Sequence, residues 1–152
     1  MSEDARHIRR AIELAREARK RGNHPFGALL VVDGQIVLEA ENTVVTQKNP
    51  THHAEMNLVQ LAWRELRAEV IGRSTLYTST EPCPMCTGAI FWSGIRRVVF
   101  SLSALELGKM AGDKFCGPCA ALFDRAHEKT EVAGPILADE GRQVHEGFWT
   151  TA

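Results

Sequence analysis

Residues 75–86 read TLYTSTEPCPMC, a segment in which a predicted strand runs directly into a predicted helix. We expect the strand over residues 74–80 and the helix over residues 84–93. Pro84 fits the first helical position, because the N–H that proline lacks would have no partner there. A strand joined closely to a helix is a unit of α/β folds, so this stretch indicates the fold class.

The flanking segments extend the same pattern in both directions. Apolar residues at helical spacing predict the first helix, and Asp33-Gly34 is a strong two-residue hairpin signal between two apolar strands. The further expected elements are a helix over 4–21, strands over 27–32 and 35–39, a polar loop over 42–51, a helix over about 51–67, a strand over 97–100, a long loop over 101–114, a helix near 120–127, a strand over 131–133 and a closing helix over 138–148. In this order they predict one domain over residues 1–152, a three-layer α/β/α sandwich with a mixed five-stranded sheet.

The composition is typical of one globular domain. The chain has 152 residues, of which 44% are hydrophobic and 24% are charged. Its longest apolar stretches fall far short of the roughly 20 residues that cross a bilayer, and residues 1–10 contain no apolar signal core. We therefore expect a cytoplasmic protein with no membrane partner.

The charge balance argues against nucleic acid as a partner, because proteins that bind a polyanion usually carry a strong basic excess. The chain has 18 basic and 19 acidic side chains, for a net charge of −1. Residues 1–22 contain seven basic and four acidic side chains, whereas residues 120–152 contain three basic and six acidic ones. We interpret the basic side chains of the first helix as a solvated face.

Two short segments carry residue types suited to metal chemistry, His53-Ala54-Glu55 near the start of the second helix and Cys83-x-x-Cys86 at the start of the third. Cysteines with this spacing let both sulfurs reach one metal, and a helix start favours their thiolates. A third ligand from His53 would leave the fourth tetrahedral position to water, which is typical of a catalytic zinc. Glu55 is then placed to act as a base without being a ligand.

These residues belong to an ordered series of segments, which are PFGA at 25–28, the loop at Asn42, PTHHAE at 50–55, TLYT at 75–78, EPCPMC at 81–86, TGAI at 87–90 and IRRVVF at 95–100. The series resembles the cytidine-deaminase-like superfamily over nearly the whole chain, whose zinc deaminases share the H-x-E…P-C-x-x-C arrangement. The resemblance implies hydrolytic deamination by an enzyme with one Zn²⁺ per chain. It implies that His53, Cys83 and Cys86 hold the zinc, and that Glu55 shuttles a proton from water to the ring nitrogen and then to the leaving amine.

The resemblance also implies a set of residues that contact the substrate. Asn42 matches a residue that hydrogen-bonds the base, and the backbone N–H of Ala54 is a candidate donor. Phe26 lies in a matching segment and is expected to line the pocket. Asp113 is a candidate for the acidic residue with which guanine deaminases bind the N–H edge of guanine.

Three branches of the superfamily compete as models for the substrate. Residues 25–28, 49–55 and 77–86 look most like bacterial guanine deaminases, so a free nucleobase, above all guanine, is the predicted small-molecule substrate. Residues 134–140 resemble the closing helix of tRNA adenosine deaminases, although the acidic tail argues against RNA. Residues 86–90 resemble cytosine deaminases, which leaves cytosine or another aminated heterocycle open. Members of the superfamily often complete their pockets across an interface, so the resemblance also implies a homodimer.

Several alternative interpretations remain at this point. A zinc-stabilised binding domain is the non-enzymatic alternative. A structural zinc site does not require a base such as Glu55 beside it, so this residue argues against that alternative. Cys116-Gly-Pro-Cys119 resembles a thioredoxin-like redox motif, which predicts a thiol of low pKa. A Cys₄ zinc knot with Cys86 would need a gap of 29 residues, where about 15–20 is usual. The plainer interpretation of these two cysteines is a turn into a helix.

Three more side chains have an ordinary structural interpretation. His52 adjoins the expected ligand His53, but the two-residue spacing to the glutamate favours His53, so we expect His52 to lie on the surface beside the site. Trp92 and Trp149 are expected to be core or interface aromatics.

Overall fold

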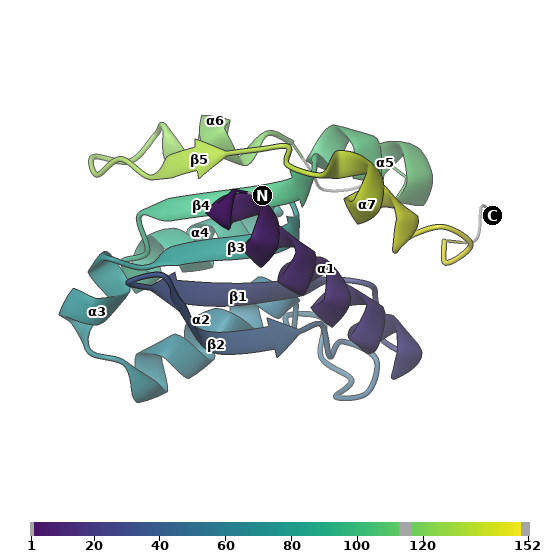
Figure 1. The fold of residues 1–152 in the computed structure, drawn as a ribbon, viewed down its shortest axis with the longest axis horizontal. Helices are drawn as coiled ribbons and strands as arrows, with labels where there is room; N and C mark the ends of the chain where they lie inside the picture. The colour runs from purple at the N-terminus through teal and green to yellow at the C-terminus, as the bar shows by residue number, and fades with distance from the viewer. Residues whose placement is uncertain (1, 113–116, 150–152) are drawn as a thin grey trace.

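A five-stranded mixed sheet lies between two layers of helices in the computed structural model, which describes residues 2–112 and 117–149 (Figure 1). The strands are β1 (Gly27–Val32), β2 (Gln35–Glu41), β3 (Thr75–Thr80), β4 (Arg97–Leu102) and β5 (Glu131–Ala133). The helices are α1 (Glu3–Lys20), α2 (Ala54–Glu65), α3 (Ala68–Gly72), α4 (Pro84–Ser93), α5 (Ala104–Ala111), α6 (Cys119–Phe123) and α7 (Ala138–Gln143). The predicted sandwich is therefore confirmed.

The strand order is β2-β1-β3-β4-β5, with β1 antiparallel to β2 and β3, and with β3, β4 and β5 parallel. Asp33 and Gly34 join β1 to β2, and both have positive φ angles, of 51° and 78°. A two-residue turn with both φ angles positive matches the twist of a hairpin, which is why the Asp-Gly pair predicts it. The parallel strands β3 and β4 end at the same edge of the sheet, where α4 and α5 begin.

Each face of the sheet has its own hydrophobic cluster. Helices α1 and α7 cover one face, while α2, α4 and α6 cover the other (Figure 1). All six residues of β1 are buried, as expected for a strand that is covered on both sides. Helix α1 crosses this strand so closely at Gly27 that a Cβ there would lie 2.5 Å from the Ala11 carbonyl oxygen. No helix of the described residues is both long and apolar enough to span a membrane.

Three expected elements differ from the structure. Residues 101–114 are not one long loop, because they contain α5, whose N-cap Ser103 accepts a hydrogen bond from the Glu106 N–H at 3.2 Å. The Ser-x-x-Glu capping pattern that signals this helix was present in the sequence. The helix expected over 51–67 starts only at Ala54, and α3 follows it as a separate element. The closing helix ends at Gln143, after which residues 144–148 form turns that include Gly147 at a φ of 74°.

His145 ties these C-terminal turns to the sheet. Its side chain is buried, with a residue exposure of 1%. Its Nδ1 accepts a hydrogen bond from the Trp149 indole N–H at 3.0 Å, and its Nε2 lies 3.4 Å from the Thr80 hydroxyl. Burial lowers the pKa of His145 to about 4, and the charge of Arg19 contributes to the same shift. His145 is therefore neutral in the folded protein at neutral pH.

The depressed pKa predicts a stability loss in acid. The unfolded chain takes up the proton near pH 6.5, whereas the folded chain resists it down to about pH 4, so the contribution of His145 is lost as the pH falls through this window. Between pH 7.5 and pH 5 this amounts to about 2 kcal/mol of unfolding free energy. Urea unfolding of the parent and of His145→Gln at both pH values measures it. The stability difference between the two proteins should shrink in acid, and equal pH slopes would refute the assignment.

Candidate metal centre

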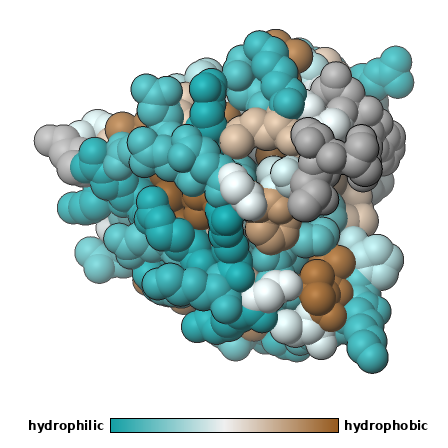
Figure 2. All heavy atoms as spheres, turned by 90° about the vertical axis from the view of Figure 1, so that its right-hand side faces the viewer, coloured by the Kyte–Doolittle hydropathy of each residue, from teal (hydrophilic) through white to brown (hydrophobic). Residues whose placement is uncertain are grey.

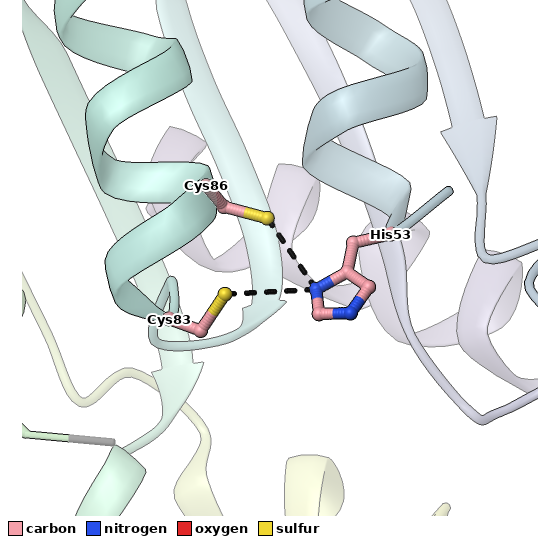
Figure 3. A group of neighbouring side chains, drawn as sticks. All are labelled: His53, Cys83 and Cys86. Carbon is pink, nitrogen blue, oxygen red and sulfur yellow. Dashed lines mark hydrogen bonds between the residues drawn. The ribbon is translucent and has the colours of Figure 1, made fainter. Parts of the chain in front are cut away.

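His53, Cys83 and Cys86 converge at the edge of the sheet where α2 and α4 begin (Figure 3). His53 is the extended residue before α2, Cys83 is the N-cap of α4, and Cys86 lies in the first turn of α4. His53 Nδ1 lies 3.6 Å from Cys83 Sγ and 3.5 Å from Cys86 Sγ. All three side chains point toward one another, so the structure brings together the three predicted ligands.

The spacing of these atoms fits zinc. A tetrahedral zinc with Zn–S bonds of about 2.3 Å and a Zn–N bond of about 2.0–2.1 Å sets nitrogen and sulfur about 3.6 Å apart. The observed separations match this distance without any rearrangement of the backbone. Three protein ligands leave one tetrahedral position open, which is typical of a catalytic site. The neighbouring His52 is not part of this cluster. Its Nδ1 instead contacts the Gln47 side-chain oxygen.

The cluster favours negative charge on one of its two sulfurs, that of Cys83. The pKa of Cys83 is lowered to about 4, chiefly by the hydrogen bond from Cys86 and further by His53. The same hydrogen bond, together with burial, raises the pKa of Cys86. His53 has a raised pKa, mainly because of its hydrogen bond to Cys83. A thiolate with a second thiol and an imidazole beside it is the donor set of a soft or borderline cation such as Zn²⁺.

Glu55 lies in the first turn of α2, beside the three-residue cluster but not part of it. Its side chain is buried, with a residue exposure of 6%. Burial is the main cause that raises its pKa to about 7, and the negative charge of Cys83 adds to the shift. A hydrogen bond with Thr78 acts in the opposite direction. A carboxyl group that titrates near neutral pH is suited to take up and release a proton during a reaction.

Two of the predicted substrate contacts lie next to each other. The Asn42 backbone N–H donates to the Phe26 carbonyl at 3.0 Å, and the following Thr43 N–H donates to the His52 carbonyl at 3.0 Å. These bonds hold the start of the Asn42 loop against the residue that precedes the ligand His53. Ala54 is the first residue of α2, so its backbone N–H is one of the four that a helix leaves without an internal partner. Asp113 lies outside the described residues.

An aromatic cluster beside the site joins the expected Phe26 to His24 and Trp149, and no pattern in the sequence indicated that these two would lie there. His24 lies close enough to His53 for the two charges to interact, which together with burial lowers the pKa of His24. The ring of Trp149 lies 5.7 Å from the ring of His24 and 6.2 Å from that of Phe26. Trp149 is thus partly buried against the site rather than in the core. Figure 2 shows this end of the molecule as mainly hydrophilic, with apolar side chains visible between the hydrophilic ones near its middle.

The described cysteine of the Cys-Gly-Pro-Cys segment has the wrong properties for redox chemistry. Cys119 is buried, and burial together with the charge of Glu81 raises the pKa of its thiol to about 12. A reactive thiol needs a lowered pKa and access to solvent. Cys116 lies outside the described residues. Cys119 therefore behaves as a small apolar side chain at the start of α6.

The fold and the open His-Cys-Cys cluster together define a zinc enzyme of the catalytic type. Residues 1–102 match the family model described as the cytidine and deoxycytidylate deaminase zinc-binding region. The chain therefore belongs to the cytidine-deaminase-like family of zinc-dependent hydrolytic deaminases. The superfamily and the chemistry predicted from the sequence are thus confirmed.

Relatives with three different activities are similar to the chain. A probable cytosine deaminase from Schizosaccharomyces pombe is 40% identical over 96% of this chain and 92% of its own length. A guanine deaminase from Bacillus subtilis is 43% identical over 70% of this chain and 69% of its own. A tRNA-specific adenosine deaminase from the same organism is 38% identical over 92% of this chain and 84% of its own. Family membership alone therefore does not identify the substrate.

A solved structure has the same fold at low sequence identity. The structure of a guanine deaminase from Nitrosomonas europaea superimposes with a TM-score of 0.78 at 22% identity, over 92% of this chain and 81% of that one. This likeness supports the three-layer architecture.

Proposed function

We propose that this deaminase acts on a free nucleobase, most of all guanine, and releases ammonia from it. The observation that carries the deamination chemistry is the buried carboxyl of Glu55, with a pKa of about 7, beside an open three-ligand cluster. The preference for a free base is supported by the aromatic cluster beside the site and by the acidic C-terminal segment. The 43% identity to a guanine deaminase supports the choice of guanine.

Each site residue has a distinct role in this proposal. His53, Cys83 and Cys86 hold the zinc, which when bound supplies the Lewis acidity that activates water near neutral pH. Glu55 takes a first proton from the attacking water and passes it to the ring nitrogen as the C–O bond forms. It then takes the second proton from the hydroxyl on the tetrahedral carbon and gives it to the amine, which leaves as ammonia while the C–N bond breaks and the carbonyl forms. Its burial serves this role, because a fully solvated glutamate would titrate near 4.5 and would be a weaker base.

Asn42 has an orientation that suits base recognition. Its side-chain oxygen accepts a hydrogen bond from the Val44 N–H at 3.0 Å, so its amide NH₂ group remains to donate. It would therefore bind a carbonyl oxygen or an unprotonated nitrogen of the ring. The backbone N–H of Ala54 is a second donor, and Phe26 offers an apolar surface to the ring. Asp113 remains a proposed contact with the N–H edge of guanine.

Each of the two alternative substrates is supported by one relative. The 40% identity to a probable cytosine deaminase extends over nearly the whole chain, which favours cytosine as the second candidate. The similarity to a tRNA-specific adenosine deaminase favours a tRNA anticodon as the third. The acidic tail argues against the third candidate, because it would repel a phosphate backbone.

The experiment that tests the proposal is ammonia release by the zinc-loaded protein. The panel contains guanine, cytosine, adenine, their nucleosides, aminated triazines and pterins, and a tRNA anticodon hairpin. Turnover of guanine well above the other compounds would support the proposal. Turnover of cytosine alone, or of the hairpin alone, would replace it with the corresponding alternative. If no compound in the panel releases ammonia although the protein holds one zinc per chain, the assignment to a common nucleobase would be refuted.

We also propose that the chain forms a homodimer through the outer face of α4. One side of this helix is buried in the protein, and the residues on its other sides are all apolar or glycine. Met85, Ala89 and Trp92 follow the spacing of one helical face, and Trp92 is 78% exposed. Two apolar hollows of about 340 and 230 Å³ lie on the adjacent flank of α4, between it and α6. A helix that is apolar all round is normally covered, and a second copy would cover this one.

The dimer predicts a strong effect of Trp92→Lys. A charge at the centre of the apolar face should shift the protein from dimer to monomer, because a lysine is costly to bury without a partner. Sedimentation velocity at micromolar concentration measures the shift. Leu105→Lys on α5 is the matched control, since Leu105 is also exposed, at 67%. A parent protein that sediments as a monomer would refute the proposed dimer.

A further inference from the structure

We propose that Glu81 is a positioning residue, whose single carboxylate holds the starts of α5 and α6 against the turn that carries Cys83. Glu81 follows β3 directly and precedes Cys83 by two residues. It is not one of the three clustered residues. The catalytic part of this inference rests on the proposed deaminase function.

The carboxylate of Glu81 bridges two distant parts of the chain. Its Oε1 accepts a hydrogen bond from the Ala104 N–H at the start of α5, at 2.9 Å. Its Oε2 accepts one from the Cys119 N–H at the start of α6, also at 2.9 Å. Its own backbone N–H donates to the Leu102 carbonyl at the end of β4, at 2.8 Å. One residue therefore joins the ends of two parallel strands to the starts of two helices.

This arrangement requires a carboxylate with the length of glutamate. Both partners are N–H donors, so both oxygens must accept, which an ionised carboxylate does. Glutamine has the same length but offers only one oxygen, and its NH₂ group would face one of the two N–H groups. Aspartate keeps two acceptors, but it is one methylene shorter, so it cannot reach both helices from the same backbone position. Hydrogen bonds to a charged acceptor are also stronger than those to a neutral one.

The start of α6 that Glu81 holds lies beside the turn that carries Cys83. Pro82 and Pro84, on either side of the ligand Cys83, line an apolar hollow together with residues 117–119. Cys119 also belongs to the buried cluster that contains Ala54, the residue before Glu55. A shift at the start of α6 would therefore disturb the hollow beside Cys83 and the buried cluster to which Ala54 belongs. Glu81 thus acts through its neighbours rather than by touching the substrate.

The first test uses the thiol of Cys119 as a reporter that is independent of any substrate. It is made in zinc-loaded protein that carries Cys116→Ser, so that Cys119 is the thiol that remains outside the metal cluster. Glu81→Gln and Glu81→Asp should both speed the alkylation of Cys119 by about tenfold or more, because the loss of a charged hydrogen bond makes local opening easier. Glu81→Asp keeps the negative charge that raises the pKa of the thiol, so a faster rate in Glu81→Gln alone would report only the removed charge and would overturn the proposal. Glu128→Gln is the matched control, since Glu128 is an exposed partner of Arg96. An unchanged alkylation rate in Glu81→Gln would overturn the proposal.

The second test separates positioning from simple stabilisation. With the substrate that the panel identifies, Glu81→Gln should raise KM by about tenfold, while zinc content stays at one per chain and kcat changes much less. A lower melting temperature with unchanged KM would make Glu81 a stabilising residue only and would overturn the positioning role. If Glu81→Gln does not fold, Glu81→Asp is measured in the same two ways. If Cys119 is alkylated faster in the Glu81 variant but no substrate is found for the parent protein, the result would contradict the proposed function. The positioning role of Glu81 would still stand.

Discussion

Glu55→Gln is expected to lower kcat by about 10²–10⁴-fold, the range that general acid–base catalysis contributes, while the protein keeps one zinc per chain. Glutamine has the shape of glutamate but cannot take up a proton at neutral pH. The structure gives this residue a buried carboxyl with a pKa of about 7, next to the ligands but not among them. The variant should therefore lose the proton transfer and keep the metal site.

The measurement combines ammonia release with the zinc content of the same sample. Glu128→Gln, an exposed glutamate that pairs with Arg96, is the control and should keep both activity and zinc. Loss of zinc in Glu55→Gln would show that the carboxyl supports the metal site. Turnover within a few-fold of the parent would show that another group shuttles the proton.

Cys83→Ala and Cys86→Ala are each expected to reduce the zinc content from one per chain to nearly zero after dialysis, and to abolish turnover. Each variant leaves two protein ligands, and the thiolates supply the negative charge that compensates the cation. The melting temperature of the parent should rise when zinc is added, because a ligand that binds only the folded state stabilises it. This rise should disappear in both variants.

Cys119→Ala is the matched control for the two ligand variants. Cys119 is a buried thiol like Cys86, but it lies at the start of α6 and outside the three-ligand cluster. It should lose some stability through the small cavity that it leaves, and it should keep its zinc. A normal zinc content in Cys83→Ala or Cys86→Ala would remove that residue from the set of ligands.

Much of the metal cluster was predictable because its residues are close together in the sequence. Cys83 and Cys86 lie within one turn of the same helix, so their spacing alone brings the two sulfurs to one point. Asp33 and Gly34 likewise determine their own turn, because the backbone angles that it needs are local. The order of helices and strands was sufficient to predict the three-layer architecture. The helix α5 was missed although its capping residues, Ser103 and Glu106, were present in the expected loop.

The sequence by itself therefore determined the fold class and identified the three clustered residues and the glutamate beside them. Only the tertiary structure decided what surrounds them. Trp149 reaches His24 across more than a hundred residues, and Glu81 reaches Cys119 across 38. Such contacts depend on how α7 and the C-terminal turns pack against the sheet and on where the α5–α6 connection returns. A local sequence pattern does not predict these long-range contacts, because the free energy that stabilises them comes from packing between distant segments.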